Sequence, residues 1–137
     1  MLRLIPSLFL AAFVSGCASP TDKFAAVVEG LQSGQFPIPI NGVFLLPQLL
    51  AGLTPKDEVF VERKSDGSLF MLFPTWYGRG NDLEGFLYCT RELKPSDYYF
   101  IDWGPGGKQQ HIDVAGRDML TVRTFRSHWY RVSRRLD

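Results

Sequence analysis

The side chains best suited to covalent chemistry in the body of the chain are Cys89, His111 and His128. A cysteine thiol beside a histidine base is a common nucleophile arrangement in hydrolases. The residues around Cys89 supply neither oxyanion donors nor a helix start, and residues 86–88 are typical of a packed strand. The sequence therefore favours a buried, inert thiol over a Cys/His hydrolase, and it identifies no catalytic residue.

A metal site is the next chemistry to consider. His111 and Asp113 are two residues apart, so a strand would place both on one face, where Asp102 or His128 could join them. No ligand cluster has a recognised spacing, so no metal or cofactor is predicted. Residues 104–108 end in Gly-Gly-Lys, but the glycine and hydroxyl residue that a phosphate-binding loop needs are missing, which favours a turn.

The best candidate for a binding surface is an aromatic loop predicted over residues 74–82. It carries Trp76, Tyr77, Arg79 and Asn81. Tryptophan, tyrosine and arginine are enriched at interfaces, and the glycines beside them leave backbone accessible. The alternative is that Trp76 and Tyr77 cover one end of the hydrophobic core, as aromatic rings often do.

The beginning of the chain has the pattern of an export signal. Arg3 precedes an apolar run over residues 4–13, which is too short to span a bilayer and ends at small residues. Val14-Ser15-Gly16-Cys17 resembles the lipobox of bacterial lipoproteins. That resemblance covers residues 1–17 only, and Val14 stands where the pattern most often has leucine. No family is recognised for the rest.

The lipoprotein resemblance implies cleavage before Cys17 and acylation of this cysteine, with palmitate among the chains. It also implies a cell-envelope location, and Ala18 favours the outer over the inner membrane. Residues 1–16 are then a signal peptide, 17–22 a lipidated tether and 23–137 a single globular domain. Acylation leaves Cys89 without a partner, whereas a Cys17–Cys89 disulfide is the alternative if the cysteine is not modified.

The net charge gives no support for nucleic-acid binding, because residues 17–137 carry 14 basic and 14 acidic side chains. The distribution is uneven, since residues 117–137 hold six basic and two acidic groups. This basic segment could contact anionic lipid headgroups or an acidic envelope component. The alternative is that Arg123, Arg131 and their neighbours occupy the solvent faces of strands.

The elements that must position these residues are mostly short strands. An apolar i, i+3, i+4, i+7 stripe predicts one helix over residues 22–32, closed by Gly34. Four prolines between residues 36 and 55 favour extended chain at 36–40 and a helical turn at 47–53. About seven strands follow, predicted at residues 58–63, 69–73, 85–90, 98–103, 110–114, 119–125 and 128–132.

Closely spaced strands and tight turns predict a mainly β fold, a small antiparallel meander that forms a barrel or sandwich, with one short N-terminal helix. The preferred function is a lipid-anchored, non-enzymatic binding or structural domain of the envelope, with another envelope protein as the expected partner and no nucleic acid. The alternatives are a small β-barrel that holds a lipid or other apolar ligand, and a Cys/His hydrolase.

Overall fold

The structure is a computed structural model that describes residues 19–102 and 104–135. The predicted signal peptide and the lipidation site at Cys17 lie outside the described residues. The chain divides into two compact units, one ending at Pro37 and one beginning at Ile38. Among the described residues, no helix has the length and apolarity needed to cross a membrane.

The first unit contains the predicted helix. A 3₁₀ turn, η1 (Asp22–Phe24), leads into α2 (Ala25–Ser33), and Gly34 ends the helix with a φ of 83°. A Cβ on Gly30 would overlap the ring of Phe36, whose amide donates to the Gly30 carbonyl at 2.9 Å. Packing of this ring therefore explains why a helix interior keeps a glycine that costs about 1 kcal/mol relative to alanine.

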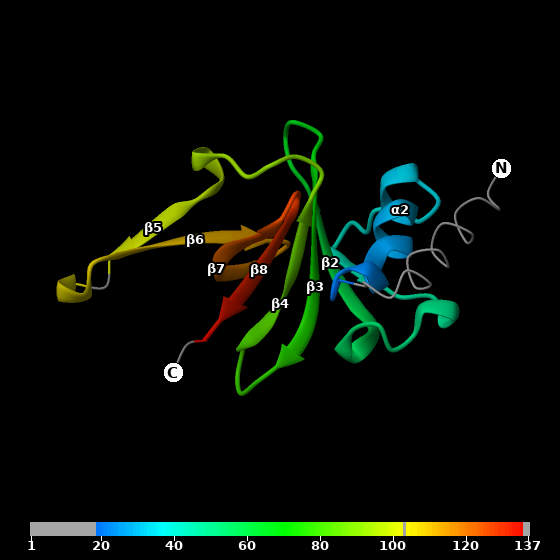
Figure 1. Cartoon of the computed structure of the whole chain (residues 1–137), viewed down its shortest axis with the longest axis horizontal. Coiled ribbons are helices and arrows are strands. Elements are labelled where there is room, and N and C mark those ends of the chain that lie inside the picture. The colour runs from blue at the N-terminus through cyan, green and yellow to red at the C-terminus, as the bar shows by residue number, and fades with distance from the viewer. Residues whose placement is uncertain (1–18, 103, 136–137) are drawn as a thin grey trace. The chain divides into compact units, whose positions relative to one another are not determined.

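The second unit contains an eight-stranded antiparallel sheet, so the predicted fold class is confirmed. The strands are β1 (Val43–Leu45), β2 (Glu58–Arg63), β3 (Leu69–Tyr77), β4 (Leu83–Cys89), β5 (Tyr99–Asp102), β6 (Lys108–Val114), β7 (Arg117–Arg126) and β8 (Trp129–Arg134). Their order is β1-β2-β3-β4-β8-β7-β6-β5. Two four-stranded meanders are thus joined where β8 pairs with β4, as Figure 1 shows.

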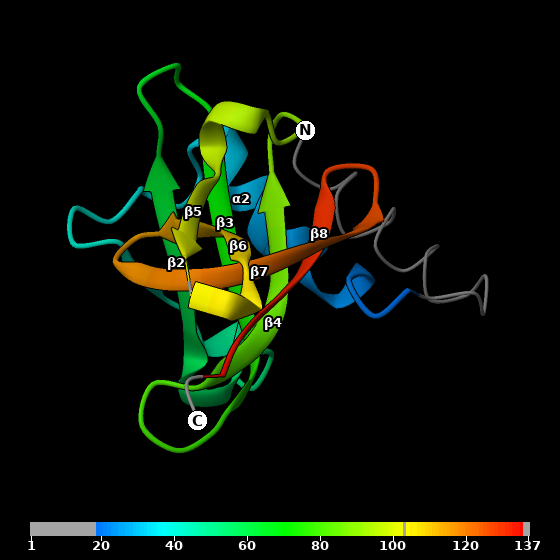
Figure 2. The same ribbon diagram turned by 90° about the vertical axis from the view of Figure 1, so that its left-hand side faces the viewer.

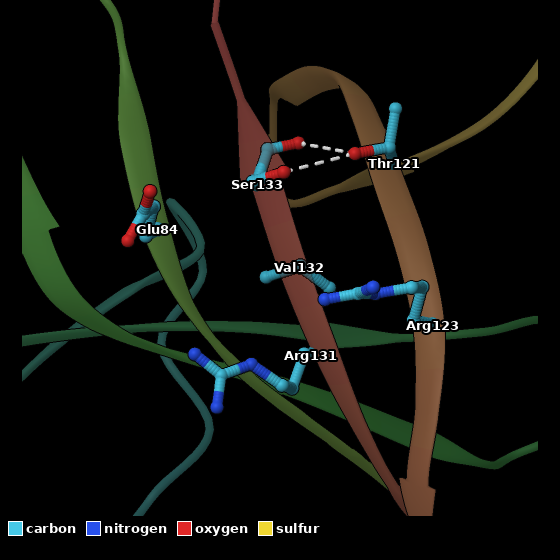
Figure 3. A pocket seen from close by; sticks show the side chains of 6 residues that line it. All are labelled: Glu84, Thr121, Arg123, Arg131, Val132 and Ser133. Carbon is cyan, nitrogen blue, oxygen red and sulfur yellow. Dashed lines mark hydrogen bonds between the residues drawn. The ribbon is translucent and has the colours of Figure 1, made fainter.

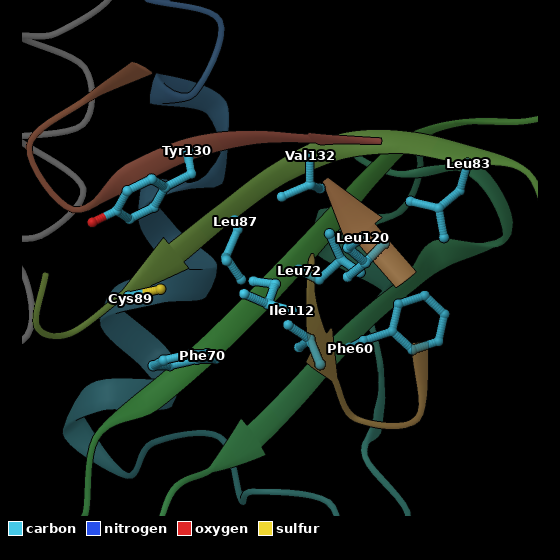
Figure 4. Close-up of a cluster of buried hydrophobic side chains, with 11 residues drawn as sticks. Phe60, Phe70, Leu72, Leu83, Leu87, Cys89, Ile112, Leu120, Tyr130 and Val132 are labelled. Atoms are coloured by element: carbon cyan, nitrogen blue, oxygen red, sulfur yellow. The ribbon is translucent and has the colours of Figure 1, made fainter. Parts of the chain in front are cut away.

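The sheet is open, with β1 and β5 at its edges, and it folds over its own hydrophobic core. In Figure 2, β6 and β7 run crosswise to β2, β3 and β4. Figure 4 shows the side chains that fill the space between them. The buried cluster consists of Phe60, Phe70, Leu72, Leu83, Leu87, Cys89, Ile112, Val114, Leu120, Tyr130 and Val132.

Two segments differ from the sequence prediction. Residues 43–45 form β1, a short edge strand that pairs with β2. The sequence predicted no strand there, only extended chain at 36–40 and a helical turn at 47–53. The predicted turn at 47–53 does contain a 3₁₀ helix, η2 (Gln48–Leu50), and η3 (Pro55–Asp57) follows it. Two further 3₁₀ turns, η4 (Pro95–Asp97) and η5 (Gly104–Gly106), flank β5.

The second difference concerns the predicted aromatic loop. Strand β3 continues to Tyr77, so only residues 78–82 remain as a turn. A bulge between Pro74 and Trp76 lets the strand pass the proline, which cannot donate to the ladder. Opposite the bulge, a Cβ on Gly85 would overlap the carbonyl oxygen of Phe73, so this close approach of two backbones requires glycine.

Candidate functional site

The structure places Cys89 in the hydrophobic core, where its side chain has no exposed surface. Burial raises the pKa of this thiol well above its usual range, so the reactive thiolate is disfavoured. The Nδ1 atom of His128 lies 2.8 Å from the carbonyl oxygen of Cys89, a contact with the backbone. These features match the predicted inert thiol and give no support to a cysteine nucleophile.

His111 is also buried, and neither of its ring nitrogens has a hydrogen-bond partner within the described parts of the chain. Its ring lies 5.9 Å from that of Tyr99, whose hydroxyl donates to Asp113 at 2.6 Å. Among the residues that the structure describes, no group of three or more His, Cys, Asp or Glu side chains is arranged to hold a metal ion.

The four residues of the predicted binding surface separate into two groups. Tyr77 and Asn81 line one pocket. Trp76 lies outside that pocket and is 40% exposed. The guanidinium carbon of Arg135 lies 5.0 Å from the centroid of its ring. Arg79 is exposed in the turn, where its carbonyl accepts from the amide of Asp82 at 3.1 Å.

We call the cavity beside Tyr77 the Tyr77 pocket. Its volume is about 240 Å³, and seven elements and the turn at 78–82 contribute to its wall. The lining residues are Val43, Lys56, Glu58, Phe60, Tyr77, Gly80, Asn81, Leu83, Arg117 and Arg134. Three of these side chains are cationic and one is a carboxylate, so the wall has a net positive charge.

At one side of this pocket, the hydroxyl of Tyr77 donates to Oε1 of Glu58 at 3.1 Å. Burial and this hydrogen bond raise the pKa of Tyr77, which therefore keeps its proton at physiological pH. The pair holds the Glu58 carboxylate against the phenol. A ligand would consequently meet an oriented carboxylate and an aromatic face.

Lys56 reaches the same aromatic ring from η3. Its Nζ lies 4.7 Å from the ring centroid of Tyr77, a cation–π distance. The backbone of Lys56 has a φ of 61°, and that of Asp57 has 55°, a left-handed conformation that is strained for residues other than glycine. Among the described residues, Lys56 has no hydrogen-bond or ion-pair partner. The strained turn therefore holds an uncompensated cation at the pocket.

Arg117 provides a second cation, from the first position of β7. Its guanidinium carbon lies 4.5 Å from the ring centroid of Phe60, and its buried Nε has no hydrogen-bond partner among residues 19–102 and 104–135. No acidic side chain in the described part of the chain forms an ion pair with it. An arginine held on an aromatic ring, with its charge uncompensated, is suited to receive an anionic group.

Arg134 differs because its charge is compensated. It is 5% exposed, and its Nε donates to the carbonyl of Asn81 at 2.8 Å. Its Nη1 donates to the carbonyl and to Oδ1 of Asp118 at 2.9 and 2.7 Å. Arg134 therefore fixes the turn at 78–82 against β7 and shapes the pocket, while Lys56 and Arg117 supply its free charge.

A second, slightly smaller pocket of about 220 Å³ lies over β4, β7 and β8 (Figure 3). We call it the arginine-pair pocket. It is lined by Glu84, Thr121, Arg123, Arg131, Val132 and Ser133. Arg123 and Arg131 are exposed, which agrees with the prediction that they occupy the solvent face of strands.

Sequence reasoning missed Lys56, Glu58, Arg117 and Arg134, which come from three separate segments. Their proximity arises from strand pairing, and η3 has no pattern that marks Lys56. For Arg117 a signal existed. Ala115 and Gly116 both have positive φ and form a two-residue turn, so reading them as a hairpin turn would have placed Arg117 in the strand.

Comparison with known proteins gives no further assignment. No family model, no curated protein and no solved structure matches this chain significantly. The two pockets and the predicted export signal are therefore the features that bear on function.

Proposed function

We propose that this chain is a lipid-anchored protein of the bacterial cell envelope whose sheet unit is a non-enzymatic binding module. The anchor is Cys17, and the outer membrane is its expected location. The ligand is a small molecule, or the exposed end of an envelope protein, that presents a carboxylate to the Tyr77 pocket. One observation carries the binding role: Lys56 and Arg117 line one pocket, and neither has an anionic partner among the described residues.

The chemistry of the wall favours a carboxylate beside a flat or apolar group. Guanidinium and ammonium donors form charge-assisted hydrogen bonds with carboxylates, roughly twice as strong as neutral ones. The rings of Tyr77 and Phe60 offer apolar surface beside these donors, as ligand pockets commonly do. Glu58 adds an acceptor for a donor group of the ligand, so the site distinguishes ligands by charge arrangement.

An apolar ligand is less well supported. The core cluster occupies the space enclosed by the sheet, so the side chains themselves fill the place that a barrel would offer to a lipid (Figure 4). The Tyr77 pocket and the arginine-pair pocket both have charged walls. Burying an apolar ligand against unpaired cations would cost free energy, because the cations would lose water without gaining a partner.

A charge-reversed pair of probes tests the binding role. Benzoate and benzylammonium have the same ring and opposite charge. In an NMR titration of the full protein, we expect benzoate to shift the signals of Lys56, Tyr77 and Arg117, and benzylammonium to shift them much less. Arg117→Gln should weaken benzoate binding about tenfold or more, because it removes a charge-assisted contact.

The control is Lys108→Gln, which removes one positive charge from the exposed start of β6, away from the pocket. Its affinity for benzoate should stay within about twofold of that of the unmodified protein, because salt screens the interaction with a distant charge. Equal binding of the two probes, or equal losses in the two variants, would contradict a carboxylate site in the Tyr77 pocket.

A further inference from the structure

The arginine-pair pocket contains a charge arrangement that does not stabilise the fold. Arg123 on β7 and Arg131 on β8 are directly opposite each other in the ladder, so their side chains leave the sheet on one face, close together. Like charges in directly opposed cross-strand positions are destabilising. Within the described residues, neither guanidinium has a hydrogen bond or ion pair that would compensate this repulsion.

An aromatic ring on the neighbouring strand holds one of these two arginines in place. The guanidinium carbon of Arg131 lies 5.1 Å from the ring centroid of Phe86, its neighbour on β4. Glu84, the carboxylate of this pocket, forms an ion pair with Arg135, which reduces its ability to neutralise Arg123 and Arg131. The pocket therefore keeps an excess of positive charge.

Hydroxyl groups border the same pocket, as Figure 3 shows. Thr121 and Ser133 are the next pair of residues on this face, directly opposite each other. The Thr121 hydroxyl donates to the Ser133 carbonyl at 3.1 Å, and the two hydroxyl oxygens lie 3.0 Å apart. Because hydroxyl protons rotate, either group can redirect its proton to an oxygen of a ligand.

We propose that the arginine-pair pocket binds the phosphate group of an anionic phospholipid headgroup. Two guanidinium groups with parallel N–H donors match the several oxygens of a phosphate better than they match any neutral group. The choice of a lipid source rests on the proposed function, because an acyl chain on Cys17 would hold the protein at a membrane surface. Binding to the headgroup would then orient the sheet unit against the bilayer.

The test uses soluble headgroups, so that it does not depend on the anchor. Glycerophosphoglycerol is the anionic probe, and glycerophosphocholine carries the same phosphodiester with a neutralising cation. We expect the full protein to bind glycerophosphoglycerol at least about tenfold more tightly than glycerophosphocholine in isothermal titration, because the choline ammonium is repelled by the arginine pair. Inorganic phosphate is the third probe.

Two double variants with equal charge loss test the residues. Arg123→Gln with Arg131→Gln should weaken glycerophosphoglycerol binding about tenfold or more. Arg63→Gln with Lys108→Gln, at exposed positions outside the pocket, should change it by about twofold or less. Without ligand, the first double variant should melt about 1–4 °C higher than the unmodified protein, because the cross-strand repulsion is removed.

Three contrary results would overturn three different parts of the proposal. Equal losses in the two double variants would overturn a specific site, and inorganic phosphate binding as tightly as glycerophosphoglycerol would overturn the lipid source. An unmodified Cys17 in the mature protein would overturn the anchor alone, since headgroup binding by the pocket would still be measurable.

Discussion

The left-handed backbone at Lys56 and Asp57 is the clearest residue-scale departure from what stability alone would favour. Two adjacent non-glycine residues with φ of 61° and 55° are strained, and the structure around them must maintain that conformation. Asp57 contributes by accepting from the amide of Gly52 at 2.7 Å. The result is a lysine directed at the ring of Tyr77, which links the local strain to the proposed carboxylate site.

A different residue, Asp97, gives a prediction about pH. Arg91 donates to both of its carboxylate oxygens, at 2.7 and 2.9 Å, and this pairing lowers the pKa of Asp97 below its usual value. A lowered folded-state pKa means that the stabilisation is complete above the unfolded-state value, about 3.9, and is lost as the pH falls through the folded-state pKa. Asp97 should therefore protect the fold at neutral pH and lose this role in acid.

We expect Asp97→Asn to lower the free energy of unfolding at pH 7 by about 1–2 kcal/mol, as for a partly exposed charge-assisted pair. The variant should also lose less stability than the unmodified protein between about pH 5 and pH 2. Urea unfolding at a series of pH values measures both effects. Glu29→Gln, on an exposed position of α2, is the control, and an equal pH response in both variants would contradict this role for Asp97.

At the scale of elements, the bulge in β3 places Tyr77 in the wall of the Tyr77 pocket. It carries the strand past Pro74, so that Tyr77 is a strand residue that faces the pocket. Gly85 makes this possible, because any side chain there would meet the backbone of Phe73 and Pro74. The register at the end of β3 thus depends on a glycine in β4.

Gly85→Ala should lower the free energy of unfolding by about 2–4 kcal/mol, since backbone atoms cannot yield without disturbing the ladder. Gly78→Ala is the matched control. Its new methyl group would meet only the end of the Trp76 ring, which is exposed and can move, so the loss should stay below about 1 kcal/mol. Chemical denaturation of both variants measures the difference, and equal losses would refute the role of Gly85.

Local patterns predicted the elements that depend on local interactions. The apolar stripe and Gly34 predicted the helix, and Asp66-Gly67 predicted the β2–β3 hairpin; both are confirmed. The insertion of β8 beside β4 could not be predicted, because it depends on contacts between residues more than 40 positions apart. Of the residues that line the Tyr77 pocket, the sequence predicted only Tyr77 and Asn81. Lys56 lies in a 3₁₀ turn that no pattern marks, and Arg117 reaches the pocket through the pairing of β7 with β8 and of β8 with β4.

The molecule as a whole combines a balanced total charge with two separate clusters of uncompensated cations. The 14 basic and 14 acidic side chains of residues 17–137 cancel in sum. Lys56 and Arg117 at one pocket, and Arg123 and Arg131 at the other, nevertheless have no anionic partners among the described residues. Net charge therefore gives no indication of where the two proposed anion sites lie.

The proposed lipid anchor gives the prediction that concerns the whole molecule. With a lipid-modified Cys17, the mature protein should enter the detergent phase of a Triton X-114 extraction and fractionate with the outer membrane. Each buried methylene contributes about 0.8 kcal/mol, so two or more chains hold a protein durably. Cys17→Ala should move it to the aqueous phase, or leave it uncleaved.

Cys89→Ala makes the same substitution at the other cysteine, in the hydrophobic core, and should not change the extraction. Mass spectrometry of the mature amino terminus identifies the modification directly. An unmodified Cys17, or a mature chain that starts elsewhere, would refute the anchor.

The placement of β8 has a consequence for biosynthesis. Until Trp129–Arg134 has been made, β4 and β7 both present unpaired edges, and the two meanders cannot join. Such edges are templates for intermolecular pairing, so a nascent or truncated chain would be prone to aggregate. Completion of this sheet is therefore a late event, and a chaperone that shields strand edges would be most useful before the eighth strand emerges.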